Sequence, residues 1–304
     1  MSCELCVNDY SVKFSTPEIR NTHDMKLRFV LIVSAVFSAM ILSATYSAAD
    51  VAPIVSPSPS ASAVLSFTVR CPFSHTDTVD PIVMPGMKGM SHQHEFFGNT
   101  STNEKSTTQS LLAAPTTCAK GSQFIDGNDH SAYWVPSLYQ DGKRIQPTAI
   151  YASYTQLSSS SGVASPFQNG FKAVSGLTSQ SVQWGCTSVD TQSLVTKTID
   201  DVPTCQAPQH LFARTSFANC WSGLSMDPID HSSHLENQVK VNGRLQCPPT
   251  NPIKVPLLTL NVQYPVATIT NAGVSLASGK PATFHADMFQ AWTNDGLAQR
   301  MRGN

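Results

Sequence analysis

Six cysteines in the mature part of the chain constrain its fold more strongly than any other feature. The chain has 304 residues and 8 cysteines, and two of the cysteines, Cys3 and Cys6, precede a predicted export signal. The remaining cysteines are even in number, and none has the CxxC spacing of a zinc site or a thioredoxin-like motif. In an exported protein we expect them to form disulfides. Their pairing stays open at this point. They are Cys71, Cys118, Cys186, Cys205, Cys220 and Cys247.

The amino-terminal region predicts export. Lys26 and Arg28 precede an apolar run over residues 29–42, and residues 47–49 are small, as at a signal-peptide cleavage site. An uncleaved anchor is the alternative. Elsewhere no stretch reaches the roughly 18 apolar residues of a spanning helix, so no stable membrane span is expected after cleavage. We predict an upstream extension or start-codon error over residues 1–24, a signal peptide over 25–49, a flexible Pro-, Ser- and Ala-rich lead-in over 50–64, and one secreted domain over 65–304.

Short runs of β character follow one another through this domain. Each run is rich in aromatic and β-branched residues and is bounded by Gly, Pro, Asp or Ser. Asp141-Gly142 and Asn242-Gly243 predict hairpin turns, and residues 287–301 are the best helical candidate. We therefore predict a mainly β fold, a β-sandwich or jelly-roll-like single domain with long loops and few short helices, stabilised by disulfides. The runs cover residues 65–71, 133–139, 148–156, 171–175, 182–186, 210–217, 238–241 and 255–264.

The low charge of the chain excludes one class of partner. Charged residues make up 13% of the sequence and the formal net charge is −1, while 41% of residues are hydrophobic. Such a chain can bury a sizeable core, but it lacks the basic field that attracts nucleic acid. We expect no nucleic-acid partner. A polysaccharide or a small-molecule ligand fits this composition better.

Residues 80–99 hold the most informative candidate site. Two prolines and two glycines predict a rigid turn, and His92 and His94 then stand two residues apart, before Phe96 and Phe97. In an extended segment this spacing places both imidazoles on one face. The pair can hold a cation, a substrate hydroxyl or a carboxylate. The alternative is that both rings are hydrogen-bonded supports of a polar loop, since neutral imidazole both donates and accepts.

Two further motifs contain histidines. Residues 227–229 repeat the opening Asp-Pro-Ile and lead to His231 and His234, whereas His285 and Asp287 stand two apart near the end of the chain. If the three segments converge, they offer neutral imidazoles and a carboxylate to zinc, copper or manganese. Alternatively, the rings only pack, and Asp230 caps the backbone that follows it. The candidate ligands of a divalent metal are His92, His94, His231, His234, His285 and Asp287.

Acid–base chemistry without a metal is a second hypothesis. Partial burial can tune carboxylates that lie beside histidines or aromatic rings. Tyr133 and Trp134 are a candidate platform for sugar stacking, with His130 beside them to bind hydroxyls. An enzyme of this kind would be a glycan hydrolase or lyase. A pocket that binds without turnover and a structural cell-surface protein are the alternatives. The candidate acids and bases are His92, His94, Asp129, Asp230 and His231.

The order and spacing of several motifs resemble a known family. They resemble the secreted family called domain of unknown function 1996 from about residue 67 to residue 292. The segments 96–99 and 284–287 resemble its bacterial branch, but His130 stands where many members have Lys or Arg. The resemblance implies an exported protein and supplies no established reaction. The motifs that carry it are Asp80-Pro81-Ile82-Val83 with Pro85-Gly86, Ser91-His92-x-His94, Ser131-Ala132-Tyr133-Trp134-Val135-Pro136, Cys220-Trp221-x-Gly223, Asp230-His231-x-x-His234 and Cys247-Pro248.

Overall fold

The protein is described by a computed structural model. The described residues are 66–121, 124–157, 163–176, 182–187, 195–197, 202–265 and 272–303. The predicted upstream extension, signal peptide and lead-in lie outside the described residues.

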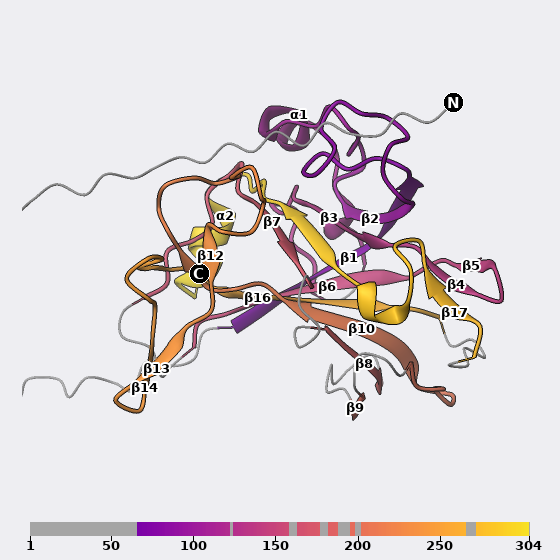
Figure 1. The fold of residues 1–304 in the computed structure, drawn as a ribbon. Helices are drawn as coiled ribbons and strands as arrows, with labels where there is room; N and C mark the ends of the chain where they lie inside the picture. Colours follow the sequence, from indigo (N-terminus) through magenta and orange to yellow (C-terminus); the bar gives the residue numbers. More distant parts are fainter. Residues whose placement is uncertain are drawn as a thin grey trace, which may run out of the picture. The chain divides into compact units, whose positions relative to one another are not determined.

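An antiparallel sheet of ten strands dominates the described part of the chain (Figure 1). Neighbours in this sheet are often far apart in sequence. For example, a strand near the end of the chain lies between two strands of its middle part. In spatial order the strands are β7 (Lys172–Ser175), β18 (Ala286–Phe289), β3 (Ala132–Pro136), β2 (His94–Gly98), β1 (Ser66–Asp77), β6 (Ala149–Thr155), β16 (Leu257–Gln263), β10 (His210–Ser216), β8 (Val182–Thr187) and β9 (Val195–Lys197).

Strand β1 divides the sheet into two halves. Its first part pairs with β6 as far as Pro72, and its second part pairs with β2 from Phe73 onward. The register with β2 shifts between Phe73 and His75, as expected for a β-bulge that bends a strand. We call β7, β18, β3 and β2 the β2–β3 half, and β6, β16, β10, β8 and β9 the β6–β16 half.

The two halves pack face to face around the main hydrophobic core. The Tyr133 hydroxyl on β3 lies 2.8 Å from the Tyr154 hydroxyl on β6, and the Ser175 hydroxyl on β7 lies 2.8 Å from that of Thr215 on β10. Large aromatic side chains from both halves are fully buried between them. Burial of this apolar surface is the main driving force for the curled sheet.

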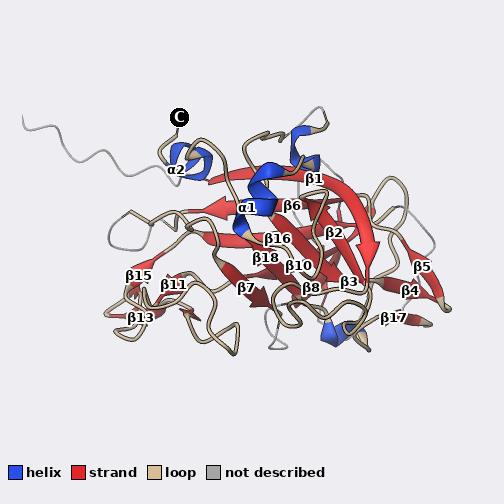
Figure 2. Ribbon diagram, turned by 90° about the horizontal axis from the view of Figure 1, so that it is seen from above, coloured by secondary structure: helices blue, strands red, loops and turns tan. Residues whose placement is uncertain are grey.

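Three smaller sheets and short helical segments surround the large sheet. Figure 2 shows α2 at the edge of the strands, whereas α1 lies in front of them. No helix among the described residues is long and apolar enough to cross a membrane. The smaller sheets are β12 (Leu235–Glu236), β11 (Cys220–Trp221) and β15 (Ile253–Lys254); β13 (Val239–Val241) and β14 (Arg244–Gln246); and β17 (Val274–Leu276), β4 (Leu138–Gln140) and β5 (Lys143–Ile145). The helices are α1 (Thr108–Ala113) and α2 (Gly296–Met301), with 3₁₀ turns η1 (Thr117–Ala119) and η2 (Pro281–Thr283).

The structure confirms the predicted mainly β class and both predicted hairpins. Asp141 and Gly142 connect β4 to β5 with φ of 51° and 75°, and Asn242 and Gly243 connect β13 to β14 with φ of 49° and 79°. Two successive positive φ values are those of the type I′ turn that Asx-Gly favours. The helix expected over residues 287–301 is wrong in its first part, because residues 287–289 pair with both β3 and β7.

All six mature cysteines form disulfides, as predicted. The pairs are Cys71–Cys118, Cys186–Cys205 and Cys220–Cys247. The first pair is fully buried and ties β1 to the turn η1. Three disulfides indicate that the protein resides in an oxidising, extracytoplasmic environment.

Helix α1 depends on a side-chain cap. The Thr107 hydroxyl accepts a hydrogen bond from the Ser110 amide, and the Ser110 hydroxyl accepts one from the Thr107 amide. Thr107→Ala should therefore lower the free energy of unfolding by about 1 kcal/mol, measured by chemical denaturation. The control Gln109→Ala changes an exposed helical residue and should cost nothing. Equal losses in the two variants would show that the cap contributes no stability.

Candidate functional site

The outer face of the β2–β3 half carries the candidate site. Side chains alternate along its strands, so that Phe97 and Tyr133 enter the main core while Phe96 and Trp134 lie in a second apolar cluster on the other face. In the sheet register Phe96 pairs with Trp134, and Trp134 pairs with Asp287. The side chain of Asp287 therefore lies on the same face of the sheet as that of Trp134.

Three imidazoles gather on this face. His94 is the first residue of β2, His92 precedes it by two residues, and His285 directly precedes β18. The ring centroids of His92 and His94 are 4.2 Å apart, and that of His285 lies 5.1 Å from His92 and 5.9 Å from His94. One ring nitrogen of each histidine lies within 4.8 Å of those of the other two. Small side-chain rotations would bring all three onto one ion.

Backbone carbonyls orient two of the rings. His94 Nδ1 lies 3.0 Å from the Val79 carbonyl oxygen, and His285 Nδ1 lies 3.0 Å from that of Thr283. A carbonyl only accepts, so each Nδ1 carries the proton, and each Nε2 is left with a free lone pair. The Nε2 atoms of His92 and His94 are buried and have no hydrogen-bond partner among the described residues. Imidazoles held in this way are typical of metal ligands.

Two carboxylates lie beside the imidazoles. The Asp287 side chain is 1% exposed, and its Oδ2 lies 3.9 Å from His285 Nε2, which is too long for a hydrogen bond. Neither Asp287 oxygen has a hydrogen-bond partner within the described part of the chain. Asp80 is better satisfied, because its Oδ1 accepts from the Ile82 amide at 2.8 Å and the Val83 amide at 2.9 Å. Asp287 is therefore the buried group that most needs a partner.

A pocket of about 250 Å³ opens onto this group of side chains. The turns before His92 form one wall, and β18 and β7 form the other. The residues lining it include Asp80, Met84, Met90, His92, His285 and Asp287. An ion held by the histidines would thus be reachable by a small ligand.

Burial controls the protonation of the site. It lowers the pKa of His92 to about 4, with a further contribution from the nearby His285. It also lowers the pKa of His94 and of His285. Burial raises the pKa of Asp80, and it raises that of Asp287 well above the usual range, helped by repulsion from Asp80. The imidazoles are therefore neutral at neutral pH, which is the form that binds metals.

The histidines of the second motif do not line this pocket. His231 Nδ1 lies 2.7 Å from Asp227 Oδ1, and His234 Nε2 donates to the Lys172 carbonyl at 2.8 Å. Asp230 is exposed, and its Oδ1 accepts from the amides of the two serines that follow His231. It therefore caps the backbone in the manner of an Asx turn, the alternative considered from the sequence.

One ion pair connects the second motif to the pocket wall. Lys172 Nζ lies 2.8 Å from Asp227 Oδ2 and donates to the Pro81 carbonyl at 3.4 Å. The structure thus brings together two of the three histidine-containing segments. Lys172 connects the third segment to the turn at Pro81.

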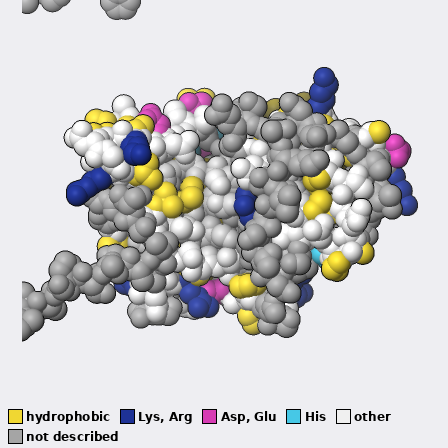
Figure 3. Space-filling model, turned by 90° about the horizontal axis from the view of Figure 1, so that it is seen from below, with side chains coloured by type: hydrophobic (Ala, Val, Ile, Leu, Met, Phe, Trp, Pro, Cys, Tyr) yellow, Lys and Arg dark blue, Asp and Glu magenta, His cyan; other side chains and the backbone are white. Residues whose placement is uncertain are grey.

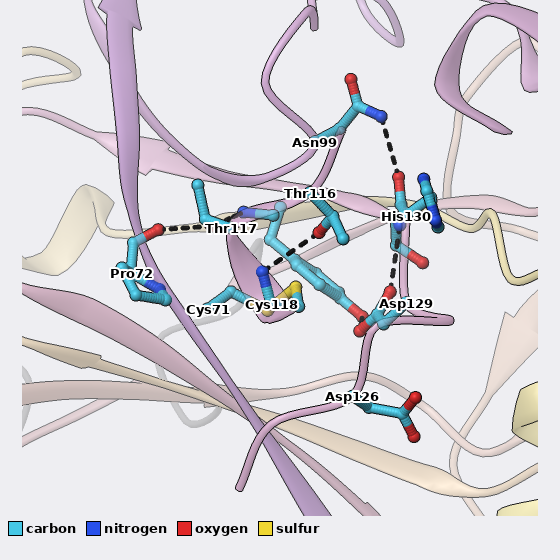
Figure 4. The surroundings of a disulfide bond; sticks show 12 residues. Cys71, Pro72, Asn99, Thr116, Thr117, Cys118, Asp126, Asp129 and His130 are labelled. Atoms are coloured by element: carbon cyan, nitrogen blue, oxygen red, sulfur yellow. Dashed lines mark hydrogen bonds between the residues drawn. A yellow bond between two sulfur atoms is a disulfide. The ribbon is translucent and has the colours of Figure 1, made fainter. Parts of the chain in front are cut away.

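Two of the predicted site residues, Asp129 and His130, lie away from the pocket, near the Cys71–Cys118 disulfide (Figure 4). Asp129 is fully buried, and it accepts from the Ser131 amide at 3.0 Å and from the Tyr133 hydroxyl at 2.9 Å. Burial raises its pKa to about 7. Both sulfurs are in the disulfide, so this group offers no thiolate to a metal.

The candidate stacking platform has no exposed face. Tyr133 and Trp134 are both 0% exposed, because the strand that carries them is covered on both sides. His130 Nδ1 donates to the Ala114 carbonyl at 2.7 Å, which supports a loop. In this conformation neither aromatic ring can stack on a sugar.

Six residues that line the pocket were not predicted as site residues, namely Asp80, Val83, Met84, Met90, Ser91 and Val174. Asp80 was noticed only as part of a turn motif, and Met84 and Met90 were not considered as site residues. The repeat of Met-x-Gly in residues 84–90 was the available signal.

Comparison with known proteins identifies the family of the chain but no reaction. No curated protein and no solved structure matches the chain. The pattern of one protein family matches residues 80–292, which include the pocket and both histidine segments that form it. That match covers more than half of the chain. The chain therefore belongs to the family described as Domain of unknown function (DUF1996).

Proposed function

We propose that the protein is a secreted metal-binding protein whose pocket holds one transition-metal ion. His92, His94 and His285 are the proposed ligands, and Asp287 is either a fourth ligand or the group that orients a bound water. The carrying observation is that ring nitrogens of three histidines from two chain segments lie within 4.8 Å of one another, and that the buried Nε2 atoms of His92 and His94 lack a hydrogen-bond partner among the described residues. Three histidines with an open position are typical of a catalytic metal site, whereas structural zinc sites are closed.

The proposed ligand of this centre is a neutral, hydroxyl-rich chain such as an extracellular polysaccharide. The pocket wall combines apolar side chains, including Val83 and Val174, with the two carboxylates Asp80 and Asp287. Apolar surface suits the C–H faces of a sugar, and carboxylate oxygens accept from its hydroxyls. On the face in Figure 3, the described Lys and Arg side chains are scattered rather than gathered. Such a surface offers no track for a charged polymer.

Metal binding is tested directly with purified protein that carries no chelating tag. After metal removal, the protein should bind one zinc ion per chain in a calorimetric titration at pH 7. His92→Ala and His94→Gln should each weaken zinc binding by at least about 100-fold, since even groups outside the first ligand shell affect affinity by 10–100-fold. The control is His210→Ala, which removes a partly buried imidazole of β10 that bonds the Tyr264 carbonyl.

The control should bind zinc like the parent. Circular dichroism and thermal unfolding establish that each variant is folded. A folded parent that takes up neither zinc nor copper nor manganese would refute the metal centre. Equal losses in the His210 variant and the pocket variants would refute the assignment of the ligands. The zinc-loaded parent would then be incubated with soluble polysaccharides, and release of reducing ends would identify hydrolysis.

A further inference from the structure

Two successive turns contain three methionines, and two of these line one wall of the pocket. Residues 84–90 read Met-Pro-Gly-Met-Lys-Gly-Met. The Met87 amide donates to the Met84 carbonyl at 3.1 Å, and the Met90 amide donates to the Met87 carbonyl at 3.4 Å. Gly86 and Gly89 occupy the third position of each turn with φ of 75°. This is the geometry of a type II turn, which requires a positive φ at that position.

The surrounding chain holds these turns in place. The Gly86 amide donates to the Glu104 carbonyl at 2.7 Å, and the Gly89 amide donates to the Thr78 carbonyl at 3.1 Å. The segment is therefore a fixed part of the pocket wall. Met84 and Met90 line the pocket together with His92 and His285, and Met87 does not.

The exposure of these side chains is unlike that of core methionines. Met90 is 67% exposed and Met87 is 53% exposed. Neither contributes to the hydrophobic clusters of the described residues. An apolar side chain that is left in water beside a pocket carries no packing role there, so its thioether sulfur is available to a ligand.

We propose that the metal of this pocket is copper, and that Met84 and Met90 contribute thioether ligands to Cu(I). The inference rests on the proposed metal centre and names its ion. Thioether sulfur is a soft ligand that selects Cu(I), whereas imidazole accepts copper and zinc alike. The histidines account for binding of a metal, and the methionines account for which metal binds.

The test compares Cu(I) with zinc in the same protein. Cu(I) is kept reduced with ascorbate under anaerobic conditions, and its affinity is measured by competition with the chromophoric chelator bathocuproine disulfonate. The double variant Met84→Leu/Met90→Leu should lose at least about tenfold in Cu(I) affinity, the lower end of the effects seen for groups around a metal. Its zinc affinity should stay unchanged. Leucine keeps the apolar volume, so the fold should be preserved.

Met87→Leu is the matched control, because it removes the same sulfur from the same loop outside the pocket. It should bind Cu(I) like the parent. X-ray absorption of the Cu(I)-loaded parent should show nitrogen and sulfur neighbours, and the sulfur signal should vanish in the double variant. A parent that binds zinc through its histidines but shows no copper–sulfur contact would overturn the copper assignment and leave the metal centre intact. Equal losses from Met87→Leu and the double variant would also overturn it. If neither ion binds, the metal centre itself fails.

Discussion

Asp287→Asn should make the metal-free protein more stable and its metal complex weaker. The Asp287 carboxylate is 1% exposed, has no hydrogen-bond partner within the described residues and is repelled by Asp80. A carboxyl group buried without a partner is costly whether it stays charged or must hold a proton at pH 8, and its replacement by a neutral group of similar shape should stabilise the protein by roughly 1–4 kcal/mol. Chemical denaturation at pH 8 with a chelator present measures this gain.

Excess zinc should reduce or reverse the difference in the free energy of unfolding between Asp287→Asn and the parent. If Asp287 ligates the ion or orients its water, the variant should bind zinc at least about tenfold more weakly. The parent then gains about 1.4 kcal/mol more than the variant from zinc at the same free concentration. This opposition of stability and binding is expected where a site keeps a strained or unpaired group for its function.

Asp227→Asn is the contrasting control. Asp227 is a partly buried carboxylate that is paired with Lys172 at 2.8 Å and with His231 at 2.7 Å. The same chemical change should therefore lower stability slightly, by less than about 1 kcal/mol. A loss of stability in Asp287→Asn with the chelator present would mean that Asp287 has a structural partner in the metal-free protein, and the argument for its role at a metal would fall.

Local sequence signals predicted much of the fold. Asx-Gly pairs predicted two hairpins, because few other residues adopt the positive φ values of these turns. Runs of β-branched and aromatic residues located most strands of the large sheet. An even number of cysteines in an exported chain predicted complete oxidation. All of these signals act within a few residues or depend on composition, so a single sequence contains them.

The assembly of the site could be predicted only in part. The spacing of His285 and Asp287 implied a shared face, but β18 lies between β3 and β7, and no local pattern encodes such long-range pairing. Trp134 shows a related difficulty. Its strand is buried on both faces. A continuous apolar run does not predict which of its aromatic rings are buried. His231 was a candidate ligand only if the three histidine segments converged, and in the structure its Nδ1 instead lies 2.7 Å from Asp227 Oδ1.

Bacterial-branch membership, secretion and cleavage near residue 50 stay predictions. The three disulfides indicate an oxidising, extracytoplasmic environment. Amino-terminal sequencing of protein recovered outside the cell addresses both secretion and cleavage.

The stability of the protein should also depend on pH through Asp129. Its pKa is raised from 3.8 to about 7, mainly because the carboxyl group is fully buried. Between these two values the folded state holds a proton that the unfolded state has released. The free energy of unfolding therefore falls as pH rises through this window, by about 1.4 kcal/mol per pH unit, and levels off above the folded pKa. The total contribution is on the order of 4 kcal/mol.

Asp129→Asn isolates this contribution. An asparagine at this position can accept from the Ser131 amide and donate to the Tyr133 hydroxyl, which in turn can donate to the Tyr154 hydroxyl. The variant and the parent should be equally stable near pH 4, and the variant should be more stable by on the order of 4 kcal/mol near pH 8. The buried histidines impose an opposite slope, but they are common to both proteins and cancel in the difference. Tyr133→Phe removes a hydrogen bond that lowers the Asp129 pKa. In this variant the free energy of unfolding should therefore continue to fall to higher pH than in the parent. If the stability difference between Asp129→Asn and the parent is the same at every pH, the carboxyl group does not titrate in this range. Water would then have to reach and solvate it.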